Sequence, residues 1–304
     1  MTTTRREFLA RSAAAGAAAL AGACASRGAG SAADPLFKLS LAQWSLHRAL
    51  EQKTIDPLDF PTIARRDYAL SGCEYVSIFY QGKARDEQYL ADLKGRASDA
   101  GVRSVLIMVD NEGSLADAAS RAAAIENHHQ WIEAAGFLGC HSIRVNARGK
   151  GSPEEQQKLM ADSLVQLANY GERYGVCVIV ENHGGLSSDG TWMAGVMRLA
   201  NNPRVGTLPD FGNFHVAEGI DYDRYQGIRD MMPFAKGVSA KSYGFDAQGD
   251  ETTIDYPLAM AIVVENGYHG FVGIEYEGDK ASEDAGIRST KALLERIRAS
   301  MSRG

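Results

Sequence analysis

Short hydrophobic runs alternate with longer stretches of helical periodicity along most of the chain. The runs predict strands at residues 39–46, 74–79, 104–109, 142–146, 176–181, 205–208, 237–241 and 272–275. Apolar residues at helical spacing predict helices between them, among others at residues 87–100, 115–135, 153–174 and 190–200. This alternation is typical of βα units around a parallel sheet. Eight such units in about 265 residues predict an α/β fold of the (β/α)8 TIM barrel type, a single domain over residues 37–304.

An open, doubly wound sheet is the alternative architecture. Its first strand would be followed by a glycine-rich loop that binds phosphate. The segment LAQWSLHRAL, which contains the end of the first predicted strand, has no glycine. The barrel is therefore the better interpretation.

The N-terminal segment has the pattern of a targeting signal. An arginine pair, Arg5 and Arg6, precedes Phe-Leu and an uncharged, alanine-rich run. This pattern is similar to a twin-arginine export signal and disfavours an ordinary amphipathic helix. We predict a twin-arginine signal peptide at residues 1–25, a tether at 26–36 and a periplasmic barrel. Cys24 lies in a sequence that resembles a lipoprotein box with its leucine one place too far upstream, so a lipid anchor there stays open.

Composition narrows the range of partners. The 304-residue chain carries a net charge of −6 without blocks of either sign. Nucleic acid is not an expected partner, because phosphate binding needs clustered lysine and arginine. Beyond the N-terminal segment, no apolar run in the sequence approaches the roughly 18 residues that span a membrane. Cys73, Cys140 and Cys177 are expected as free thiols, although a Cys140–Cys177 disulfide stays open.

Three acidic residues stand where predicted strands end: Glu181, Asp210 and Glu275. The carboxyl ends of all strands in a barrel meet on one face, where barrel enzymes have their active sites. Carboxylates that meet in a partly buried site repel one another unless protons or a cation intervene. A single glutamate would more simply form a salt bridge or a helix cap, but three equivalent positions favour a shared metal site. Oxygen ligands favour Mg²⁺ or Mn²⁺, and Zn²⁺, Co²⁺ or Ni²⁺ would fit if a nitrogen joined them.

Two basic residues are expected close to these acids. Lys241 ends the seventh predicted strand, where it can form an ion pair with Asp210 or Glu275, contact a substrate, or do both. Arg144 lies on the fourth strand, where it can bind a substrate oxygen or neutralise Glu181.

Further candidates for substrate binding lie near other strand ends. His183 shares a face with the preceding acidic residue and can bind substrate or metal. Trp44 can stack on a sugar or belong to the core, and Asn213 can be a turn residue or a ligand. No role is predicted for His128, and Glu277 is expected in a solvated loop or at a helix start.

The segments VIVENH, PDFGN and GIEYEG, with a lysine late in strand seven, resemble the sugar phosphate isomerase/epimerase superfamily of xylose isomerase-like TIM barrels. The resemblance covers residues 39–298, and the N-terminal signal indicates an exported subgroup. In such proteins a metal is held by Glu after strand five, Asp after strand six, His or Gln on strand seven and Glu after strand eight. The resemblance thus implies Glu181, Asp210 and Glu275 as metal ligands.

The chain departs from the family pattern at two positions. The strand-seven ligand is commonly the histidine of His-x-Lys, but this chain has Ser239 before Lys241. Asn213 stands where a histidine is common after strand six. Either water or His183 would then complete the metal's ligand set.

The resemblance implies a metal-dependent isomerase or epimerase that acts through an enediolate intermediate. Glu181 and Glu275 would remove and return a proton, and Lys241 completes the predicted catalytic residues. Export argues for a non-phosphorylated sugar or keto-sugar as substrate. Two alternatives stay open: a lyase that eliminates the aglycone from a 3-keto-glycoside, and a non-catalytic periplasmic sugar-binding barrel, which Ser239 favours. The sequence does not predict the oligomeric state.

Overall fold

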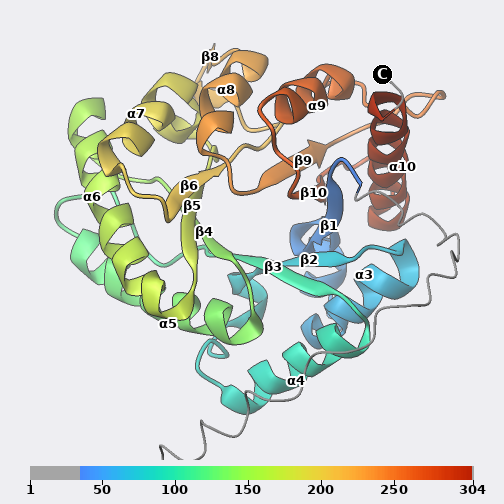
Figure 1. Cartoon of the computed structure of the whole chain (residues 1–304), viewed down its shortest axis with the longest axis horizontal. Helices are drawn as coiled ribbons and strands as arrows, with labels where there is room; N and C mark the ends of the chain where they lie inside the picture. Colours follow the sequence, from blue (N-terminus) through green and yellow to red (C-terminus); the bar gives the residue numbers. More distant parts are fainter. Residues whose placement is uncertain (1–34, 303–304) are drawn as a thin grey trace, which may run out of the picture. The chain divides into compact units, whose positions relative to one another are not determined.

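The computed structural model describes residues 35–302, and the predicted signal peptide, Cys24 and most of the tether lie outside these described residues. Within residues 35–302, eight parallel strands pair in the order β6-β5-β4-β3-β2-β1-β10-β9. Their bounds are β1 Lys38–Ala42, β2 Gly72–Val76, β3 Arg103–Met108, β4 Ser142–Asn146, β5 Cys177–Glu181, β6 Val205–Leu208, β9 Val238–Ser242 and β10 Phe271–Tyr276. The predicted α/β barrel is confirmed (Figure 1).

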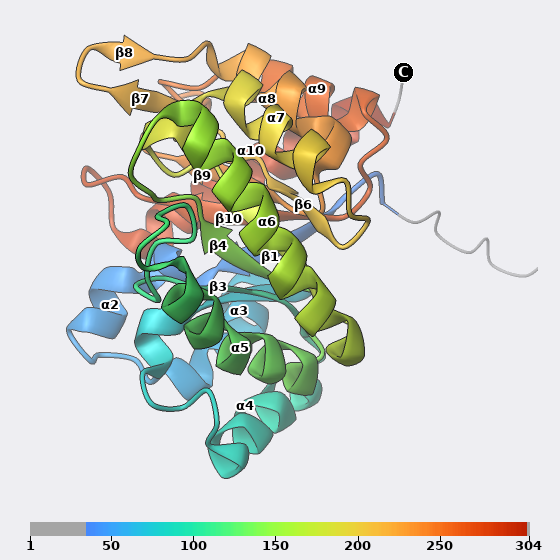
Figure 2. The same ribbon diagram turned by 90° about the vertical axis from the view of Figure 1, so that its left-hand side faces the viewer.

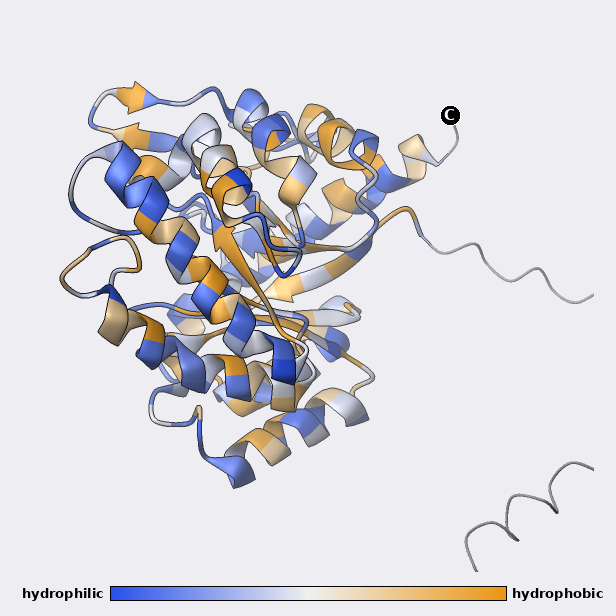
Figure 3. Ribbon diagram, turned by 60° about the vertical axis from the view of Figure 1, so that its left-hand side comes forward, coloured by the Kyte–Doolittle hydropathy of each residue, from blue (hydrophilic) through white to orange (hydrophobic). Residues whose placement is uncertain are grey.

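Helices form the outer layer around the strands (Figure 1). Their bounds are α2 His47–Glu51, α3 Phe60–Tyr68, α4 Glu87–Asp99, α5 Arg121–Leu138, α6 Pro153–Gly171, α7 Gly190–Ala200, α8 Arg224–Met231, α9 Tyr256–Glu265 and α10 Glu283–Met301. Figure 3 shows hydrophobic strands at the centre and helices of mixed polarity around them. This is the distribution expected when each helix buries one face against the sheet.

The interior of the barrel is partly apolar and partly polar. One apolar cluster is formed by Ala42, Val76, Val105, Leu106, Met108, Ile179 and Leu208. Buried polar side chains lie on or just beyond the strands, namely Glu74, Glu181, Asp210, Ser239, Lys241 and Glu275. The packed strands therefore fix the positions of these polar groups, which a loop would leave free to move.

The barrel closes between β6 and β9 at a seam that we define as residues 207–211 and 235–239. No regular ladder joins these two strands within the described chain, but isolated bridges pair Thr207 with Ala235 and Asp210 with Ser239. Three backbone hydrogen bonds cross the seam: Lys236 N–H to Thr207 O at 3.0 Å, Ser239 N–H to Pro209 O at 2.9 Å and Phe211 N–H to Ser239 O at 3.1 Å. By contrast, β4 and β5 pair over five residues. The seam is thus the junction of the described ring that isolated bridges close in place of a regular ladder.

The first two strands end earlier than predicted. Both are followed by 3-10 helices, Gln43–Leu46 after β1 and Ser77–Tyr80 after β2. Side chains of the first 3-10 helix bond to neighbouring backbone groups: Ser45 Oγ donates to Ile274 O at 3.0 Å, and Gln43 Oε1 accepts from Val76 N–H at 2.9 Å. These bonds replace strand pairing, so the hydrophobic run continues while the strand does not.

Other parts of the described chain differ from the predictions in detail. The helix expected from residue 115 begins at Arg121. The loop before it is held by a bridge between Ala116 and Gly149, a residue that follows β4. A short hairpin of β7 (His215–Ala217) and β8 (Ile220–Asp221) was not predicted, and it extends beyond the helices in Figure 2. The three cysteines of the described chain are free thiols. None of its helices is long and apolar enough to cross a membrane.

Candidate active site

The three predicted acidic residues meet at one end of the barrel. Glu181 ends β5, Asp210 follows β6 and Glu275 lies near the end of β10. One carboxylate oxygen of each lies within 4.8 Å of those of the other two, and all three side chains are buried. The structure therefore brings together the acids that the strand pattern singled out.

Asp210 is the most firmly held of the three acids. Its Oδ1 accepts hydrogen bonds from the backbone N–H of Gly212 at 2.8 Å and of Asn213 at 2.9 Å. Asn182 Oδ1 accepts from the Asp210 backbone N–H at 2.7 Å. Asn213 in turn donates from Nδ2 to Glu181 Oε1 at 3.2 Å, so it contacts an acid of the site directly.

Ser239 lies between two of the acids. Its hydroxyl is 2.8 Å from Asp210 Oδ2 and 2.7 Å from Glu275 Oε2. A serine hydroxyl has one hydrogen to donate, so it satisfies one of the two carboxylates at a time. At the strand-seven position the chain thus has a short hydrogen-bonding group, where the resemblance predicted an imidazole.

Lys241 is buried among three acids. Its Nζ lies 3.3 Å from Glu275 Oε1, 3.2 Å from Glu277 Oε2 and 3.7 Å from Asp210 Oδ2. The side chain is only 1% exposed, and although burial opposes the charge, these carboxylates raise the pKa of the ammonium well above its ordinary value. Glu277 lies in a loop after β10, as expected, and it is partly exposed, but its carboxylate is also a partner of the buried lysine, which was not predicted.

Arg144 connects the acids to a second carboxylate that sequence reasoning missed. Its Nε lies 2.8 Å from Glu181 Oε2, and its guanidinium also donates to Asp110 Oδ1 at 2.7 Å. Asn146 Nδ2 donates to the same Asp110 oxygen at 2.7 Å. Burial raises the pKa of Asp110, but Arg144 and Asn146 outweigh it and hold that pKa below its ordinary value. Asp110 follows β3 as the other acids follow their strands, so the same signal could have identified it.

If all were ionised, the acids of the site would carry more negative charge than Arg144 and Lys241 neutralise, and two of them have raised pKa values. Burial, followed by repulsion from Glu275, raises the pKa of Glu181 to about 7 against the opposing effect of Arg144. Burial and the neighbouring glutamates raise the pKa of Asp210 to about 8 despite Lys241. Glu275 is the exception: burial raises its pKa, but Lys241, Ser239 and Arg144 together hold it below its ordinary value.

The donor set fits a hard divalent cation. The contact between Arg144 Nε and Glu181 Oε2 is poorly aligned, and within the described chain neither atom has a hydrogen bond. A buried carboxylate oxygen without a hydrogen bond is a group that a cation can satisfy. A cation would also neutralise the excess charge of the cluster. The residues present therefore fit a metal ion held by Glu181, Asp210 and Glu275.

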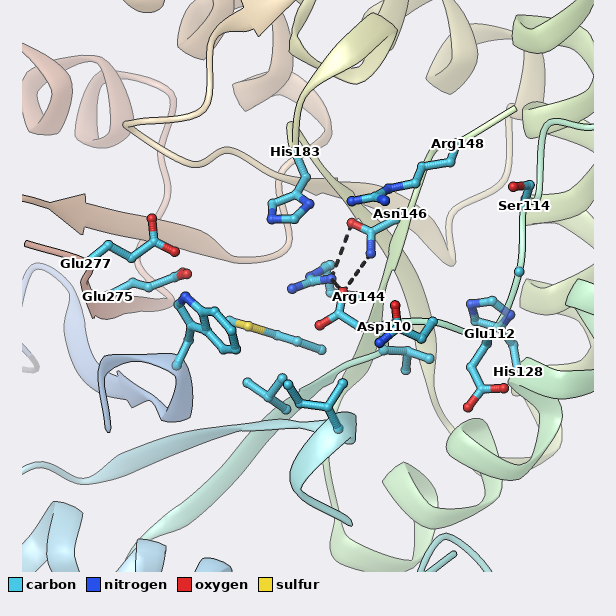
Figure 4. A pocket seen from close by; sticks show the side chains of 17 residues that line it. Asp110, Glu112, Ser114, His128, Arg144, Asn146, Arg148, His183, Glu275 and Glu277 are labelled. Carbon is cyan, nitrogen blue, oxygen red and sulfur yellow. Dashed lines mark hydrogen bonds and ion pairs between the residues drawn. The ribbon is translucent and has the colours of Figure 1, made fainter. Parts of the chain in front are cut away.

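A cavity of about 460 Å³ adjoins this cluster at Glu275, the one of the three acids that lines it. Figure 4 shows Glu275 and Glu277 at one end, Arg144, Asp110 and Asn146 along the middle, and Glu112, His128 and Ser114 at the far end. We call the far end, formed by Glu112, Ser114 and His128, the outer end; Arg148 reaches from its side toward Asn146 (Figure 4). His128 lies on a helix as expected, but it is buried and lines the cavity.

Two further candidates for substrate binding line the same cavity. His183 lies above Arg144 in Figure 4, and burial with the nearby cations Arg144 and Lys241 lowers its pKa to about 4. Among the described residues, His183 is not part of the group of acids that could hold a metal ion. Trp44 also lines the cavity, while its indole stacks on His47 with ring centres 4.7 Å apart. Trp44 is thus both a wall of the cavity and a packed side chain.

Comparison with known proteins places the chain among related barrels. The family described as xylose isomerase-like TIM barrel matches residues 66–298. The α subunit of a C-glycoside deglycosidase from Microbacterium trichothecenolyticum is 36% identical over 55 residues, which are 18% of this chain and 15% of that protein. The chain therefore aligns with only a small part of that relative.

Similar solved structures have low sequence identity. L-ribulose 3-epimerase has a TM-score of 0.68 at 15% identity, with 88% of this chain and 96% of the other covered. The IOLI protein with a bound zinc atom has a TM-score of 0.67 at 16% identity, covering 87% and 99%. The 3-keto-D-glucoside 4-epimerase of E. coli has a TM-score of 0.62 at 16% identity, covering 80% and 94%. At these identities the structures establish a shared fold.

Proposed function

Because the chain belongs to the xylose isomerase-like TIM barrel family, we propose that it is a metal-dependent isomerase or epimerase of a non-phosphorylated sugar or keto-sugar. The observation that carries this proposal is the group formed by Glu181, Asp210 and Glu275, whose oxygens lie within 4.8 Å of one another beside a cavity. Structural similarity to L-ribulose 3-epimerase supports the reaction class, and the zinc in the IOLI protein supports a metal.

Glu181, Asp210 and Glu275 would hold the metal ion. Mg²⁺ or Mn²⁺ is favoured because the donors are carboxylate oxygens, whereas Zn²⁺, Co²⁺ or Ni²⁺ would suit a set that includes nitrogen. When bound, a divalent cation polarises a carbonyl oxygen of the substrate and stabilises negative charge that develops there.

The acids of the chain would move the proton. Glu275 lines the cavity and has a lowered pKa, so its ionised carboxylate is placed to accept a proton from the carbon next to the carbonyl. The electron pair of that C–H bond passes to the carbonyl oxygen and gives an enediolate. Glu181 would return a proton to the same carbon, which gives the epimer. Return to the former carbonyl carbon would give the isomer, with the proton of the neighbouring hydroxyl passing to the former carbonyl oxygen. Lys241 helps to keep Glu275 ionised. The substrate gains back the proton that it lost, so its composition does not change.

The charge of the cavity argues for an uncharged substrate. Its lining has four carboxylates, those of Asp110, Glu112, Glu275 and Glu277, and two guanidinium groups, of which Arg144 is already paired with acids and Arg148, within the described chain, is not. A phosphate dianion would meet net repulsion from these carboxylates. A free or keto-sugar presents hydroxyl groups that the same carboxylates can bind.

Metal analysis and one substitution test the proposal. The purified protein should contain a divalent cation, and turnover of keto-sugars should be lost on chelation and restored by Mn²⁺ or Mg²⁺. Glu181→Gln should reduce kcat by at least about 100-fold, because general acid–base catalysis typically contributes that much. Glu126→Gln, on the exposed surface of α5, is the matched control and should keep full activity. Full turnover by the metal-free protein or by Glu181→Gln would exclude the mechanism.

A lyase is the second candidate, and two findings favour it. The matched segment of 55 residues belongs to a C-glycoside deglycosidase, and one similar structure is a 3-keto-D-glucoside 4-epimerase. Removal of the same proton would form the enediolate, whose electrons expel the aglycone from the β carbon, and Glu181 would protonate the leaving atom. Release of aglycone from a 3-keto-glycoside, measured by chromatography, separates the lyase from an epimerase. Absence of turnover on either substrate class would favour a non-catalytic sugar-binding barrel.

Export by the twin-arginine route to the periplasm is a further proposal that rests on the sequence of residues 1–25. Replacing Arg5 and Arg6 by lysine should retain the protein in the cytoplasmic fraction. Mass spectrometry of the N-terminus of the exported form would show either cleavage without lipid or a lipidated Cys24. Unchanged export of the double-lysine variant would contradict the proposal.

A further inference from the structure

We propose that the outer end of the cavity binds a second sugar ring, so that the substrate is a two-ring saccharide in place of a free monosaccharide. This inference rests on the proposed function, which places the reacting ring at Glu181 and Glu275. It adds the chemical class of the group attached to that ring.

The size of the cavity is the first argument. It extends from Glu275 on β10 to residues that follow β3 and β4, and β1 and β2 lie between these strands in the sheet. Neighbouring strands lie about 4.8 Å apart, so the cavity spans roughly 14 Å along the wall of the barrel. Its volume of about 460 Å³ would hold roughly 15 water molecules at about 30 Å³ each. A single six-carbon ring at the acids would leave the outer end unfilled.

His128 gives the outer end a fixed hydrogen-bond acceptor. The imidazole is 2% exposed, and its Nδ1 lies 2.7 Å from the backbone carbonyl of Ala124. A carbonyl oxygen can only accept, so Nδ1 carries the hydrogen and Nε2 is the acceptor. No described residue donates to Nε2. Because burial lowers the pKa of His128, the ring stays neutral and able to accept.

Glu112 supplies a second acceptor that is held in place. Trp131 Nε1 donates to Glu112 Oε1 at 2.8 Å, and Asn127 Nδ2 donates to the Glu112 backbone carbonyl at 3.3 Å. The other carboxylate oxygen, Oε2, has no hydrogen-bond partner in the described part of the chain. One oxygen thus anchors the side chain and the other is available to a ligand.

Ser114 adds a donor at the outer end, and Arg148 adds donors between the outer end and Asn146 (Figure 4). Neither side chain has a hydrogen bond or an ion pair with another residue of the described chain. The outer end therefore combines a neutral imidazole acceptor and a carboxylate with a hydroxyl, and a guanidinium lies between it and the middle of the cavity. Sugar hydroxyl groups both donate and accept, and they match such a mixed set.

The same residues disfavour other attached groups. An aryl aglycone would be expected to stack on an aromatic side chain. Among the residues that line the cavity, the one such side chain besides the histidines is Trp44, which follows β1 beside β10 and so lies near Glu275. A phosphate could pair with Arg148, but it would meet the carboxylates of Glu112 and Asp110 in the same cavity. A second sugar ring remains the best match.

The test compares binding of one-ring and two-ring sugars by calorimetry, independently of turnover. Cellobiose, lactose and maltose are titrated against the methyl glycosides of their reacting rings, with a phenyl glycoside as the aryl probe. At least one disaccharide should bind about tenfold more tightly than its methyl glycoside, the factor expected for one hydrogen bond to a charged group. The phenyl glycoside should show no such gain.

Glu112→Gln probes the outer end directly. The amide oxygen can keep the bond from Trp131, while the group facing the ligand changes from an acceptor to a donor. We call the ratio of the dissociation constants of the methyl glycoside and the disaccharide the two-ring advantage. Glu112→Gln should lower this ratio by about tenfold. If Glu112→Gln does not fold, Ser114→Ala is the second variant, and it should also lower the ratio. Glu126→Gln removes a charge from a side chain that is 73% exposed and should leave the advantage unchanged.

Equal binding of one-ring and two-ring sugars, or no binding of any disaccharide, would overturn the inference. So would an aryl glycoside that binds as tightly as the disaccharides, or a Glu112→Gln variant with an unchanged advantage. Turnover with Mn²⁺ is measured separately on oxidised forms of the same sugars. A two-ring preference without turnover would reject the proposed function and retain the outer end as a sugar site.

Discussion

At the scale of single residues, Lys241 is a buried charge that lies among three carboxylates. Its ammonium is almost completely buried and lies within 3.7 Å of oxygens of Asp210, Glu275 and Glu277. Removing one partner of such a buried group leaves the remaining charges without compensation. Lys241 therefore stabilises the acids of the site whatever its role toward substrate.

Lys241→Met should destabilise the chelated protein by roughly 3–5 kcal/mol, because Asp210 and Glu275 would lose their counter-charge. A divalent cation should restore part of this loss, since it would compensate the same carboxylates. Urea unfolding with EDTA or with Mn²⁺ measures both effects. Lys291→Met, which breaks an ion pair with Glu295 on the surface of α10, is the control and should change stability by at most about 0.5 kcal/mol. A Lys241→Met variant as stable in EDTA as the wild type would contradict the assigned role.

Glu74 is a buried acid that the proposed chemistry does not use. Ser40 Oγ donates to its Oε1 at 2.6 Å, and its Oε2 has no hydrogen-bond partner in the described chain. Burial raises the pKa of Glu74 from its ordinary 4.5 to about 8, against the opposing bond from Ser40. The folded protein thus retains a proton that the unfolded chain releases above pH 4.5.

This difference predicts a pH-dependent stability. The contribution of Glu74 is fully present below pH 4.5 and is lost progressively as the pH rises to about 8. Glu74→Gln keeps an acceptor for Ser40 and cannot ionise. It should therefore exceed the wild type in stability at pH 8 by a few kcal/mol, at about 1.4 kcal/mol per pKa unit. Urea unfolding at pH 5 and pH 8 measures the effect, and an advantage that does not grow with pH would refute it.

The sequence allowed some of these residues to be predicted and not others. Glu181, Asp210 and Glu275 could be predicted because each ends a hydrophobic run, and parallel strands carry their ends to one face. The pairing of Asp110 with Arg144 could not, because it depends on side chains from two strands. The ion pair between Glu277 and Lys241 could not be predicted for the same reason, because the two side chains come from two neighbouring strands, β9 and β10.

At the scale of elements, helix and strand types followed from periodicity, whereas their ends depended on particular side chains. α7 was predicted at its observed bounds, residues 190–200. The first strand was predicted too long, because bonds from Gln43 and Ser45 to other strands, which set its end, leave no trace in a hydrophobic pattern. An element is thus easier to predict than its boundary.

The serines at the N-cap positions of α5 and α6 provide a matched test, because only one of them forms a cap hydrogen bond. Ser152 forms a capping box with Glu155 at the start of α6, whereas Ser120 precedes α5 without a side-chain cap hydrogen bond. Ser152→Ala should reduce the free energy of unfolding by about 1 kcal/mol, and Ser120→Ala should change it by much less. Urea unfolding of both variants measures the difference. Equal losses would show that the capping box does not stabilise α6.

At the scale of the whole molecule, the candidate metal site and the closing seam share residues. Asp210 and Ser239 form one of the two bridges across the seam, and Asp210 is also one of the three predicted ligands. A ligand that binds only the closed barrel should stabilise the junction that it touches.

Hydrogen exchange can detect this coupling. The amides of Phe211 and Ser239 donate across the seam, and their exchange should slow by about 100-fold when Mn²⁺ is present at about 100 times its dissociation constant. Amides of β4 and β5 pair in a regular ladder and should change less. Equal slowing throughout the barrel would indicate global stabilisation, without a specific effect at the seam.

The bridge between Asp210 and Ser239 also constrains how this protein can change during evolution. The backbone of these two residues closes the ring, and their side chains belong to the candidate active site. A substitution at either position that alters the reactivity of the site therefore also affects the seam that closes the barrel. New catalytic properties should arise more readily from changes at the outer end, where Glu112 and Ser114 lie on a loop that does not close the barrel.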